Sequence, residues 1–346
     1  MLAVLAVAAA VFGALVYGAA FWRGQREARH ITPITPRPLE RDLVVVIPAR
    51  NEVRRLPPTL QALLADPSPH LQVVVVDDDS DDGTARVARA LDDPRLTVVG
   101  GPGPPPPGRF GKPRALAFGV AALPRTELVL CLDADVVVQP GLLGGLVAAL
   151  QDSRAAALSG LPDLETVTAV ERALVPAFVA AVAATHPPSH VHDDARPVAF
   201  LNGQLLLVRR DALDDVGGFL GVQDTVLEDV FLARRLKARG HRVRLVDVRG
   251  LARTRMYTTA AEVVQGFAKN ARALHGDRLV PLAALLALGA WAPVVAGGLA
   301  TATANRHDDV VATLALVVAA ACAAANRRRL GGGAAWGLAS PVVQSV

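Results

Sequence analysis

Hydrophobic positions follow two different patterns along the 346-residue chain. Three long runs, at residues 1–22, 279–304 and 310–325, contain no charged side chain. The region between them, residues 41–255, contains short apolar runs that alternate with stretches of helical periodicity. These patterns predict membrane helices at both ends of the chain and one α/β domain between them.

The first run is long enough to cross a bilayer, because a helix rises about 1.5 Å per residue and residues 1–22 would span roughly 33 Å. Its positive charges, Arg23, Arg26 and Arg29, follow the run instead of preceding it. This order favours a retained anchor over a cleaved signal peptide, and it predicts that the next domain is cytoplasmic.

The two later runs predict a pair of antiparallel transmembrane helices, joined by the polar turn 305–309. The alternative is a buried helical hairpin in a soluble protein. We expect a multi-pass protein of the cell membrane, with a membrane-proximal segment at 256–278. The fold of the Gly-rich tail 331–346 is not predicted.

The short runs between the anchors are rich in β-branched residues, as is typical of strands that are buried on both faces. They cover residues 43–47, 71–76, 96–99, 128–132, 199–208 and 243–246. Their alternation with helical stretches predicts a mainly parallel sheet flanked by helices. Such a sheet binds its ligand beyond the carboxyl ends of its strands.

Acidic residues stand at these strand ends. Asp77 and Asp78 end the second predicted strand, and Asp133 and Asp135 follow the fourth. Carboxylates combined with substrate phosphates and water are the usual environment of Mg²⁺ or Mn²⁺ in proteins. The Asp-x-Asp pair alone would also suit a solvated loop with a helix cap, but two acidic strand ends at one edge favour a cation site.

The composition limits the classes of partner and of metal site that we expect. The chain has a net charge of +4, 52% hydrophobic residues but only 4% aromatic residues, and its one dense basic cluster is at 327–329. A basic stripe with interleaved aromatics is therefore absent from the sequence, and we expect no nucleic-acid partner.

Cys131 and Cys322 stand in apolar surroundings, so neither a disulfide nor a metal site is expected. His186, His190 and His192 lack a supporting cluster, which favours a flexible loop over a zinc site.

Two acidic pairs have the pattern of helix starts. Asp81 and Asp82 precede one helical stretch, and we assign them to helix capping. Glu228 and Asp229 open an amphipathic stretch, where acidic residues also favour the helix dipole. Geometry alone leaves the role of this second pair open.

Six motifs occur in an order that resembles family 2 of the glycosyltransferases. They are Ile47-Pro48-Ala49-Arg50-Asn51-Glu52, Val76-Asp77-Asp78-Asp79-Ser80, Gly111-Lys112, Leu132-Asp133-Ala134-Asp135, Asn202-Gly203-Gln204 and Leu227-Glu228-Asp229. The segments 104–112 and 253–257 are similar to the subgroup found with hopanoid and carotenoid biosynthesis. The resemblance implies a GT-A fold that binds a nucleotide-diphosphate sugar with Mg²⁺ or Mn²⁺ and inverts the anomeric centre.

The resemblance also implies roles for individual residues. Those on the nucleotide-sugar side are Pro48, Arg50, Glu52, Asp77, Asp78, Lys112, Asp133 and Arg255. Those on the acceptor side are Asn202, Gly203, Gln204 and Glu228. Asp135, assisted by Asp133, would hold the cation, and Asp229 matches the general base. Lys112, or Arg253 with Arg255, would hold diphosphate oxygens, although a solvated basic loop is the alternative for these three.

Departures from the family pattern refine this expectation. Asp79 stands where the family commonly has Gly, and Arg109 replaces an aromatic residue. The Gln-x-x-Arg-Trp motif of processive members is missing from the sequence, which favours transfer of a single sugar. We therefore expect transfer to a lipid or terpenoid hydroxyl at the membrane. The alternatives are a polyprenyl-phosphate sugar synthase and an inactive membrane scaffold with the same fold.

Overall fold

The computed structural model describes residues 23, 26–122, 125–168, 171–172, 175, 179, 182–183 and 185–275. The chain divides into two compact units. One comprises residues 30–163 and 188–256, and it contains every residue of the candidate site. The other contains the described parts of 1–29, 164–187 and 257–346.

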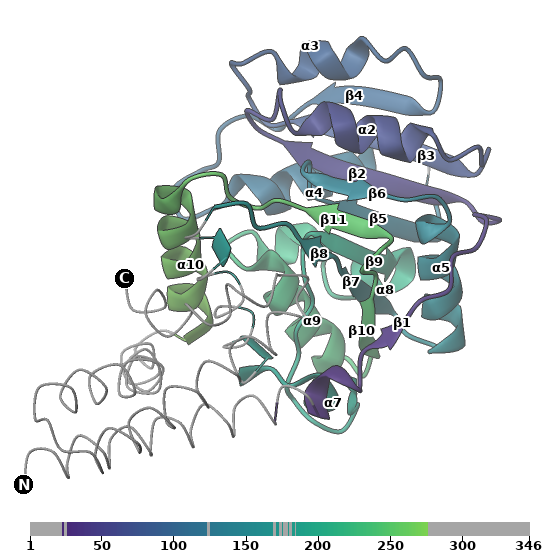
Figure 1. Cartoon of the computed structure of the whole chain (residues 1–346), viewed down its shortest axis with the longest axis vertical. Coiled ribbons are helices and arrows are strands. Elements are labelled where there is room, and N and C mark those ends of the chain that lie inside the picture. Colours follow the sequence, from purple (N-terminus) through teal and green to yellow (C-terminus); the bar gives the residue numbers. More distant parts are fainter. Residues whose placement is uncertain are drawn as a thin grey trace, which may run out of the picture. The chain divides into compact units, whose positions relative to one another are not determined.

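The first unit is built on an eight-stranded sheet (Figure 1). Its order is β1 (Thr32–Pro33), β10 (Val243–Asp247), β7 (Ala157–Leu161), β9 (Leu205–Arg209), β5 (Leu128–Leu132), β2 (Leu43–Ala49), β3 (Leu71–Asp77) and β4 (Leu96–Gly100). Only β9 runs antiparallel to its neighbours, β5 and β7. A smaller sheet has the order β6 (Val136–Val138), β11 (Ala252–Thr254) and β8 (Asp163–Leu164).

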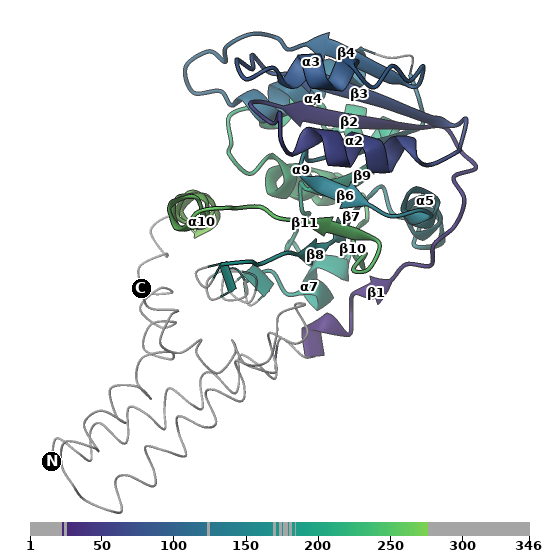
Figure 2. The ribbon, with the colours of Figure 1, turned by 45° about the horizontal axis from the view of Figure 1, so that its top comes forward.

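Helices cover both faces of the large sheet (Figure 2). They are α2 (Leu56–Leu64), α3 (Thr84–Arg89), α4 (Gly111–Ala121), α5 (Leu142–Asp152), α7 (Pro188–His192), α8 (Arg210–Asp215), the 3₁₀ helix η1 (Phe219–Val222) and α9 (Glu228–Ala238). The expected mainly parallel sheet flanked by helices is thus confirmed.

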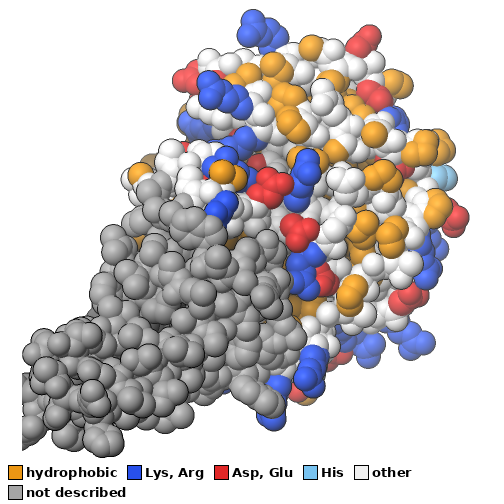
Figure 3. All heavy atoms as spheres, in the orientation of Figure 1, with side chains coloured by type: hydrophobic (Ala, Val, Ile, Leu, Met, Phe, Trp, Pro, Cys, Tyr) orange, Lys and Arg blue, Asp and Glu red, His pale blue; other side chains and the backbone are white. Residues whose placement is uncertain are grey.

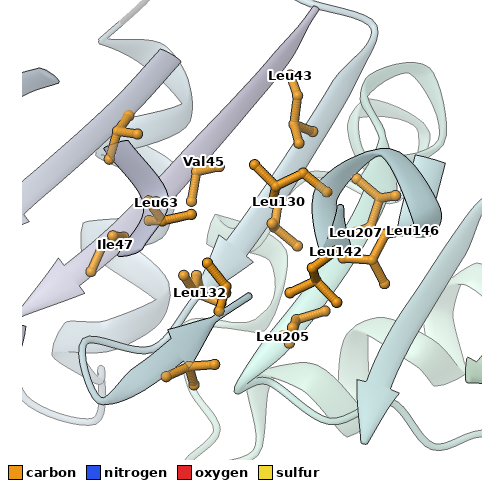
Figure 4. Packing of buried hydrophobic residues seen from close by; sticks show 14 of the residues in the cluster. Leu43, Val45, Ile47, Leu63, Leu130, Leu132, Leu142, Leu146, Leu205 and Leu207 are labelled. Carbon is orange, nitrogen blue, oxygen red and sulfur yellow. The ribbon is translucent and has the colours of Figure 1, made fainter. Parts of the chain in front are cut away.

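Strand β2 shows why its apolar residues are continuous. Val45 and Ile47 belong to the hydrophobic cluster that includes α2 and α5, whereas Val44 and Val46 belong to the cluster that includes α4 and α9. Figure 4 shows the first cluster, with Leu63 of α2 beside β2. Because successive side chains point to opposite faces, a strand covered on both sides must be apolar at every position.

Helix α4 lies unusually close to the sheet. A Cβ atom at Gly119 would overlap the side chain of Val46 and lie 2.8 Å from Cγ2 of Val76. Only glycine permits this approach. The close contact fixes α4 on the sheet and so fixes Lys112, the second residue of α4, near the carboxyl ends of the strands.

The observed strands differ from the predicted ones in three respects. The short strands β1, β6, β8 and β11 were not predicted. Strand β7, with the sequence Ala-Leu-Ser-Gly-Leu, was not predicted, because small residues weaken the β-branched signal. The run predicted at 199–208 begins as a strand only at Leu205, and residues 199–204 form the preceding loop.

The second unit contains α10 (Ala260–His275). The carboxylate of Glu262 accepts a hydrogen bond of 2.8 Å from the backbone N–H of Thr258 and so caps the first turn. The rings of Tyr257 and Phe267 pack edge to face, with their centroids 5.3 Å apart.

The predicted location, as a multi-pass protein of the cell membrane with a cytoplasmic domain, is corrected by the structure. Within the described part of the chain, no helix combines the length and the apolar character that a bilayer crossing requires. The longest described helix, α10, has 16 residues, and about 20 apolar residues are needed. The predicted spans 1–22, 279–304 and 310–325 and the tail 331–346 lie outside the described residues.

Candidate functional site

Two loops at the carboxyl ends of β2 and β3 are joined by hydrogen bonds. Asn51, with φ of 58°, donates its backbone N–H to Oγ of Ser80 over 3.0 Å. The backbone N–H of Glu52 donates to Oγ1 of Thr84 over 2.8 Å, and that of Val53 to Oδ2 of Asp82 over 3.1 Å. These bonds hold the first motif against the second.

Asp82 serves this loop structure. Besides accepting from Val53, it accepts a hydrogen bond of 2.9 Å from the backbone N–H of Thr84, the first residue of α3. This arrangement agrees with the assignment of Asp82 to the helix start, whereas Asp81 donates its backbone N–H to Oδ1 of Asn51 over 3.0 Å.

Asp77 and Asp78 lie at the end of β3, as predicted. The backbone N–H of Asp78 donates to the carbonyl of Ala49 over 2.8 Å, so the chain is still paired to β2 here. Oδ1 of Asp77 is buried and has no hydrogen-bond partner among the described residues. Burial raises the pKa of Asp78, against the opposing effect of the Arg50 guanidinium. Arg50 and Asp77 therefore both lie close enough to Asp78 to affect its charge.

Asp133 and Asp135 occupy the turn between β5 and β6. The carbonyl of Asp133 accepts from the backbone N–H of Val136 over 3.2 Å, which closes the turn. Oδ1 of Asp135 is buried without a hydrogen-bond partner among the described residues. Burial, together with the negative charges of Asp133 and Glu52, raises the pKa of Asp135 to about 7.

Glu52 belongs to the same acidic group. Its Oε2 atom is also buried and has no hydrogen-bond partner within the described structure, but it forms an ion pair at 3.7 Å with Nη1 of Arg55. Burial raises the pKa of Glu52, Arg55 lowers it, and Asp133 raises it further. Three of the predicted donor-side acids thus lie within electrostatic range of one another.

Lys112 joins this acidic group to the start of α9. Its Nζ atom lies 2.7 Å from Oδ1 of Asp133 and 3.1 Å from Oε1 of Glu228. Burial alone would lower the pKa of Lys112, but the carboxylates of Asp133 and Glu228 hold it well above its usual value. Lys112 is therefore a cation with two carboxylate partners, and it lies in α4 and not in a loop.

Asp229 is held by the backbone on two sides. Its Oδ2 accepts from the N–H of Gly203 over 2.6 Å, and its Oδ1 accepts from the N–H of Val230 over 2.8 Å. Burial and the adjacent charge of Glu228 raise the pKa of Asp229 to about 7, although Lys112 and the two N–H groups oppose the rise. A carboxyl group with such a pKa is suited to general-base chemistry near neutral pH.

The loop of Asn202, Gly203 and Gln204 is also fixed in place. The backbone N–H of Asn202 donates to Oγ of Ser159 over 2.8 Å, and Nδ2 of Asn202 donates to Oε1 of Gln204 over 3.0 Å. The carbonyl of Gln204 accepts from the backbone N–H of Asp133 over 3.0 Å. The acceptor-side loop is thus bonded directly to the predicted cation-binding turn.

The remaining predicted residues lie at the same edge or next to it. Pro48 is in β2 and pairs with Val76. Thr254, the last residue of β11, pairs with Val136, so Arg255 follows a strand that lies beside the Asp133–Asp135 turn.

The turn fits a divalent cation. Asp135 offers a buried oxygen with no partner within the described structure, and Asp133 offers a second carboxylate. No group of three or more Asp, Glu, His or Cys side chains among the described residues is arranged around one position. Two carboxylates suit Mg²⁺ or Mn²⁺, because these ions commonly take their other ligands from substrate phosphates and water.

The histidine segment differs from the expected flexible loop. His190 and His192 lie in the short helix α7, and Nε2 of His192 accepts from the backbone N–H of Leu245 over 2.9 Å. Burial and the nearby Arg244 lower the pKa of His192 to about 4, so its imidazole is neutral. Lys237 fixes the following residues, because Nζ contacts the carbonyls of His190, Val191, Asp193 and Val198 at 2.8–3.3 Å. Cys131 is buried and forms no disulfide with a described residue.

Two contributors were missed at the sequence level. Ser159 is fully buried in β7 and anchors Asn202. Thr254 has a buried hydroxyl group, which lowers the pKa of Asp135. Glu228, which was predicted on the acceptor side, has a side chain that is only 6% exposed and pairs with Lys112. A serine inside an otherwise apolar run was the available signal for Ser159.

Acidic and basic side chains are interspersed on the face shown in Figure 3. Within the site, Lys112 and Asp133 form one such pair of opposite charges.

Comparison with known proteins gives one family match and several partial relatives. The model of the family described as "Glycosyltransferase like family 2" matches residues 40–272. Succinoglycan biosynthesis protein ExoU of Rhizobium meliloti (strain 1021) is 36% identical over 112 residues, which cover 31% of this chain and 30% of that protein. The 4,4'-diaponeurosporenoate glycosyltransferase of Staphylococcus haemolyticus (strain JCSC1435) is 49% identical over 47 residues, covering 14% and 12%. The chain thus matches less than a third of the length of either relative.

Among solved structures, the chain is similar to the mannosyltransferase PcManGT of Pyrobaculum calidifontis, which was determined with GDP-Man and Mn²⁺. The TM-score is 0.59 at 23% identity, and the alignment covers 100% of this chain and 99% of the mannosyltransferase. This similarity establishes a shared fold.

Proposed function

This chain belongs to the glycosyltransferase-like family 2, and we propose that it moves a single sugar from a nucleotide-diphosphate sugar to a hydroxyl group of a lipid of terpenoid type. The transfer inverts the anomeric centre and uses Mg²⁺ or Mn²⁺. Asp229 is the general base. The observation that carries the proposal is that Lys112 pairs both with Asp133 of the Asp133–Asp135 turn and with Glu228, the neighbour of Asp229 in the chain.

The donor side follows from the first two strand ends. Pro48, Arg50 and Glu52 line the nucleotide pocket, and the unpaired Oδ1 of Asp77 accepts from the base. Asp133 and Asp135 would hold the cation, which would neutralise the charge that develops on the diphosphate as it leaves. Lys112 and Arg255 contact the diphosphate oxygens. The mannosyltransferase of similar fold was crystallised with a nucleotide sugar and Mn²⁺, which supports this arrangement.

On the acceptor side, Asp229 accepts the proton of the attacking hydroxyl group. The acceptor oxygen then bonds to the anomeric carbon, the bond from that carbon to the diphosphate oxygen breaks, and the nucleoside diphosphate departs with the bonding electron pair. The N–H groups of Gly203 and Val230 keep the carboxylate of Asp229 in one orientation throughout. Asn202, Gln204 and Glu228 complete this side.

Two observations support an apolar acceptor. One relative is named as a glycosyltransferase of 4,4'-diaponeurosporenoate. In this chain, Phe110 is 38% exposed and stands two residues before Lys112, so apolar surface is available beside the site. A terpenoid body would cover such a surface while its hydroxyl group reaches Asp229.

The test is transfer from labelled UDP- and GDP-sugars to terpenoid alcohols by the Asp229→Asn variant. The isosteric amide cannot accept the proton, and general-base catalysis typically contributes about 10²- to 10⁴-fold. We expect kcat to fall by that factor while nucleotide binding is retained. Asp152→Asn, which makes the same change at an exposed position in α5, is the control. Full activity of Asp229→Asn with an alcohol would refute the assigned base, and activity only with polyprenyl phosphate would indicate a sugar-phosphate synthase.

A further inference from the structure

Lys112 occupies the position of a counter-cation at Asp133. Its ammonium group lies 2.7 Å from Oδ1 of this carboxylate, which the proposed function assigns to the divalent cation. We propose that Lys112 competes with the divalent cation for Asp133, so that the cation binds tightly only together with the nucleotide diphosphate. This inference rests on the proposed function and adds an order of binding to it.

The competition follows from charge. A divalent cation on Asp133 and Asp135 would share a carboxylate with the ammonium group of Lys112, and two cations at such a distance repel each other. The pair of Lys112 and Asp133 is a charge-assisted bond, and its 2.7 Å distance is at the short end for such bonds. The cation must break or weaken this bond before it can bind.

Glu228 is the second carboxylate that binds the ammonium group of Lys112. Its Oε1 lies 3.1 Å from Nζ, and its side chain is only 6% exposed, so this carboxylate is a fixed partner. An ammonium group has three donors. Lys112 can therefore stay bonded to Glu228, release Asp133 to the cation and direct its other donors toward diphosphate oxygens.

The diphosphate resolves the conflict between the two cations. Its negative charges attract both the divalent cation and Lys112, so each cation gains a partner when the nucleotide binds. Binding of the cation and binding of the nucleotide are then coupled, and the coupling must be equal in both directions.

The position of Lys112 in its helix argues against a purely structural role. It is the second residue of α4, where the helix dipole disfavours a positive charge. Two carboxylates from distant segments offset this cost: Asp133, which directly follows β5, and Glu228, the first residue of α9. A lysine that served only the helix would be better placed in its last turn.

The experiment is titration of Mn²⁺ into the full chain, followed by calorimetry, with and without saturating UDP or GDP. Complexation of Mn²⁺ by free nucleotide is measured separately and subtracted. The variant is Lys112→Met, which keeps the length of the side chain and removes its charge. Lys269→Met, the same change at an exposed position in α10, is the control. Circular dichroism verifies that both variants are folded.

We expect Lys112→Met to bind Mn²⁺ alone about tenfold more tightly than the wild type, within the usual range of coupling between two ligands. The gain in Mn²⁺ affinity that nucleotide produces should shrink by a similar factor. Lys269→Met should match the wild type. Equal Mn²⁺ affinities of Lys112→Met and wild type without nucleotide would overturn the inference.

A second experiment compares the effect of Glu228→Gln in the wild type and in the Lys112→Met background. Glu228→Gln should weaken the binding of Mn²⁺ alone, because Lys112 then has only Asp133 as a partner, and it should have little effect in the Lys112→Met background. An equal effect in both backgrounds would show that Glu228 does not act through Lys112. If the wild type binds neither nucleotide nor Mn²⁺, the proposed function itself fails. Binding that is unchanged by Lys112→Met overturns only the competition.

Discussion

The backbone N–H of Gly203 donates a 2.6 Å hydrogen bond to Oδ2 of Asp229, and no side chain separates the two residues. A Cβ atom at position 203 would lie 3.0 Å from that oxygen and 3.2 Å from Oε1 of Glu228. Because Gly203 has no side chain, the carboxylate of Asp229, the proposed base, can lie this close to the backbone of residue 203.

Substitution of Gly203 by alanine should displace Asp229 without changing any charge. Small displacements of a catalytic group typically cost up to about 100-fold in rate, so we expect kcat to fall by roughly 10- to 100-fold. The affinity for the nucleotide sugar, measured by calorimetry, should stay close to that of the wild type. Gly100→Ala adds the same methyl group where no atom lies within 4 Å of the new Cβ, and its kcat should be normal. A normal kcat for Gly203→Ala would contradict the assigned geometry.

The pH dependence of transfer should report the ionisation of Asp229. Its pKa is raised to about 7, first by burial and then by Glu228. Because the base acts as the carboxylate, kcat should increase as the pH rises through about 7. A bound cation lowers the pKa of Asp135, so saturating Mn²⁺ removes that group from the profile.

The variant Glu228→Gln removes the like charge beside Asp229 and should shift the rising limb of the pH profile to lower pH. The measurement is kcat between pH 5 and pH 9 at saturating donor and acceptor. Asp152→Asn serves as the control, and its limb should coincide with that of the wild type. A limb that stays in place in Glu228→Gln would show that Glu228 does not set the pKa of Asp229.

Replacing Asp135 by asparagine should stabilise the protein in the absence of divalent cations. The pKa of Asp135 is raised to about 7 by burial and by Asp133 and Glu52. Between its unfolded-state pKa and about 7 the folded state retains a proton that the unfolded chain has lost, so the wild type loses stability as the pH rises through this range. At pH 8 the variant should gain about 1–3 kcal/mol in the free energy of unfolding, the usual cost of a buried unsatisfied group.

Urea denaturation at pH 8 and pH 4.5 in EDTA tests this expectation. The gain should be small at pH 4.5, where the carboxyl group is protonated in the folded state. Addition of Mn²⁺ with nucleotide should stabilise the wild type but not Asp135→Asn, because only the wild type retains the complete cation site. An equal response of both proteins would remove Asp135 from the proposed ligands.

Lys237→Met should destabilise the fold while sparing the chemistry. Nζ of Lys237 contacts four backbone carbonyls at 2.8–3.3 Å, and the variant leaves them without this donor. We expect a loss of about 1–3 kcal/mol in the free energy of unfolding. Lys269→Met is the matched control on an exposed surface. The kcat of the folded Lys237→Met variant should remain within about twofold of the wild type, since Lys237 lies outside the site.

Much of the sheet could be predicted because its central strands are buried on both faces. Strands β2 and β5 therefore have uninterrupted apolar sequences, and β3 has four consecutive valines, at 73–76. Strand β7 could not be found in this way, since its alanine, serine and glycine carry little strand propensity. The antiparallel direction of β9 could not be predicted either, because an apolar run has the same sequence pattern in a parallel and in an antiparallel strand.

The candidate site was predictable one residue at a time, but its connections were not. The Asp133–Asp135 turn follows from an acidic pair after an apolar strand. The contact of Lys112 with both Asp133 and Glu228 depends on how α4 packs against the sheet, which Gly119 permits. Such tertiary contacts between distant segments leave no trace in local sequence patterns.

The reversed strand β9 gives the site a mechanical property. The bond from the N–H of Asp133 to the carbonyl of Gln204 continues the ladder in which Leu132 pairs with Leu205. A shift of the loop that holds Gly203 would therefore also move the Asp133–Asp135 turn, because one backbone hydrogen bond joins the two segments.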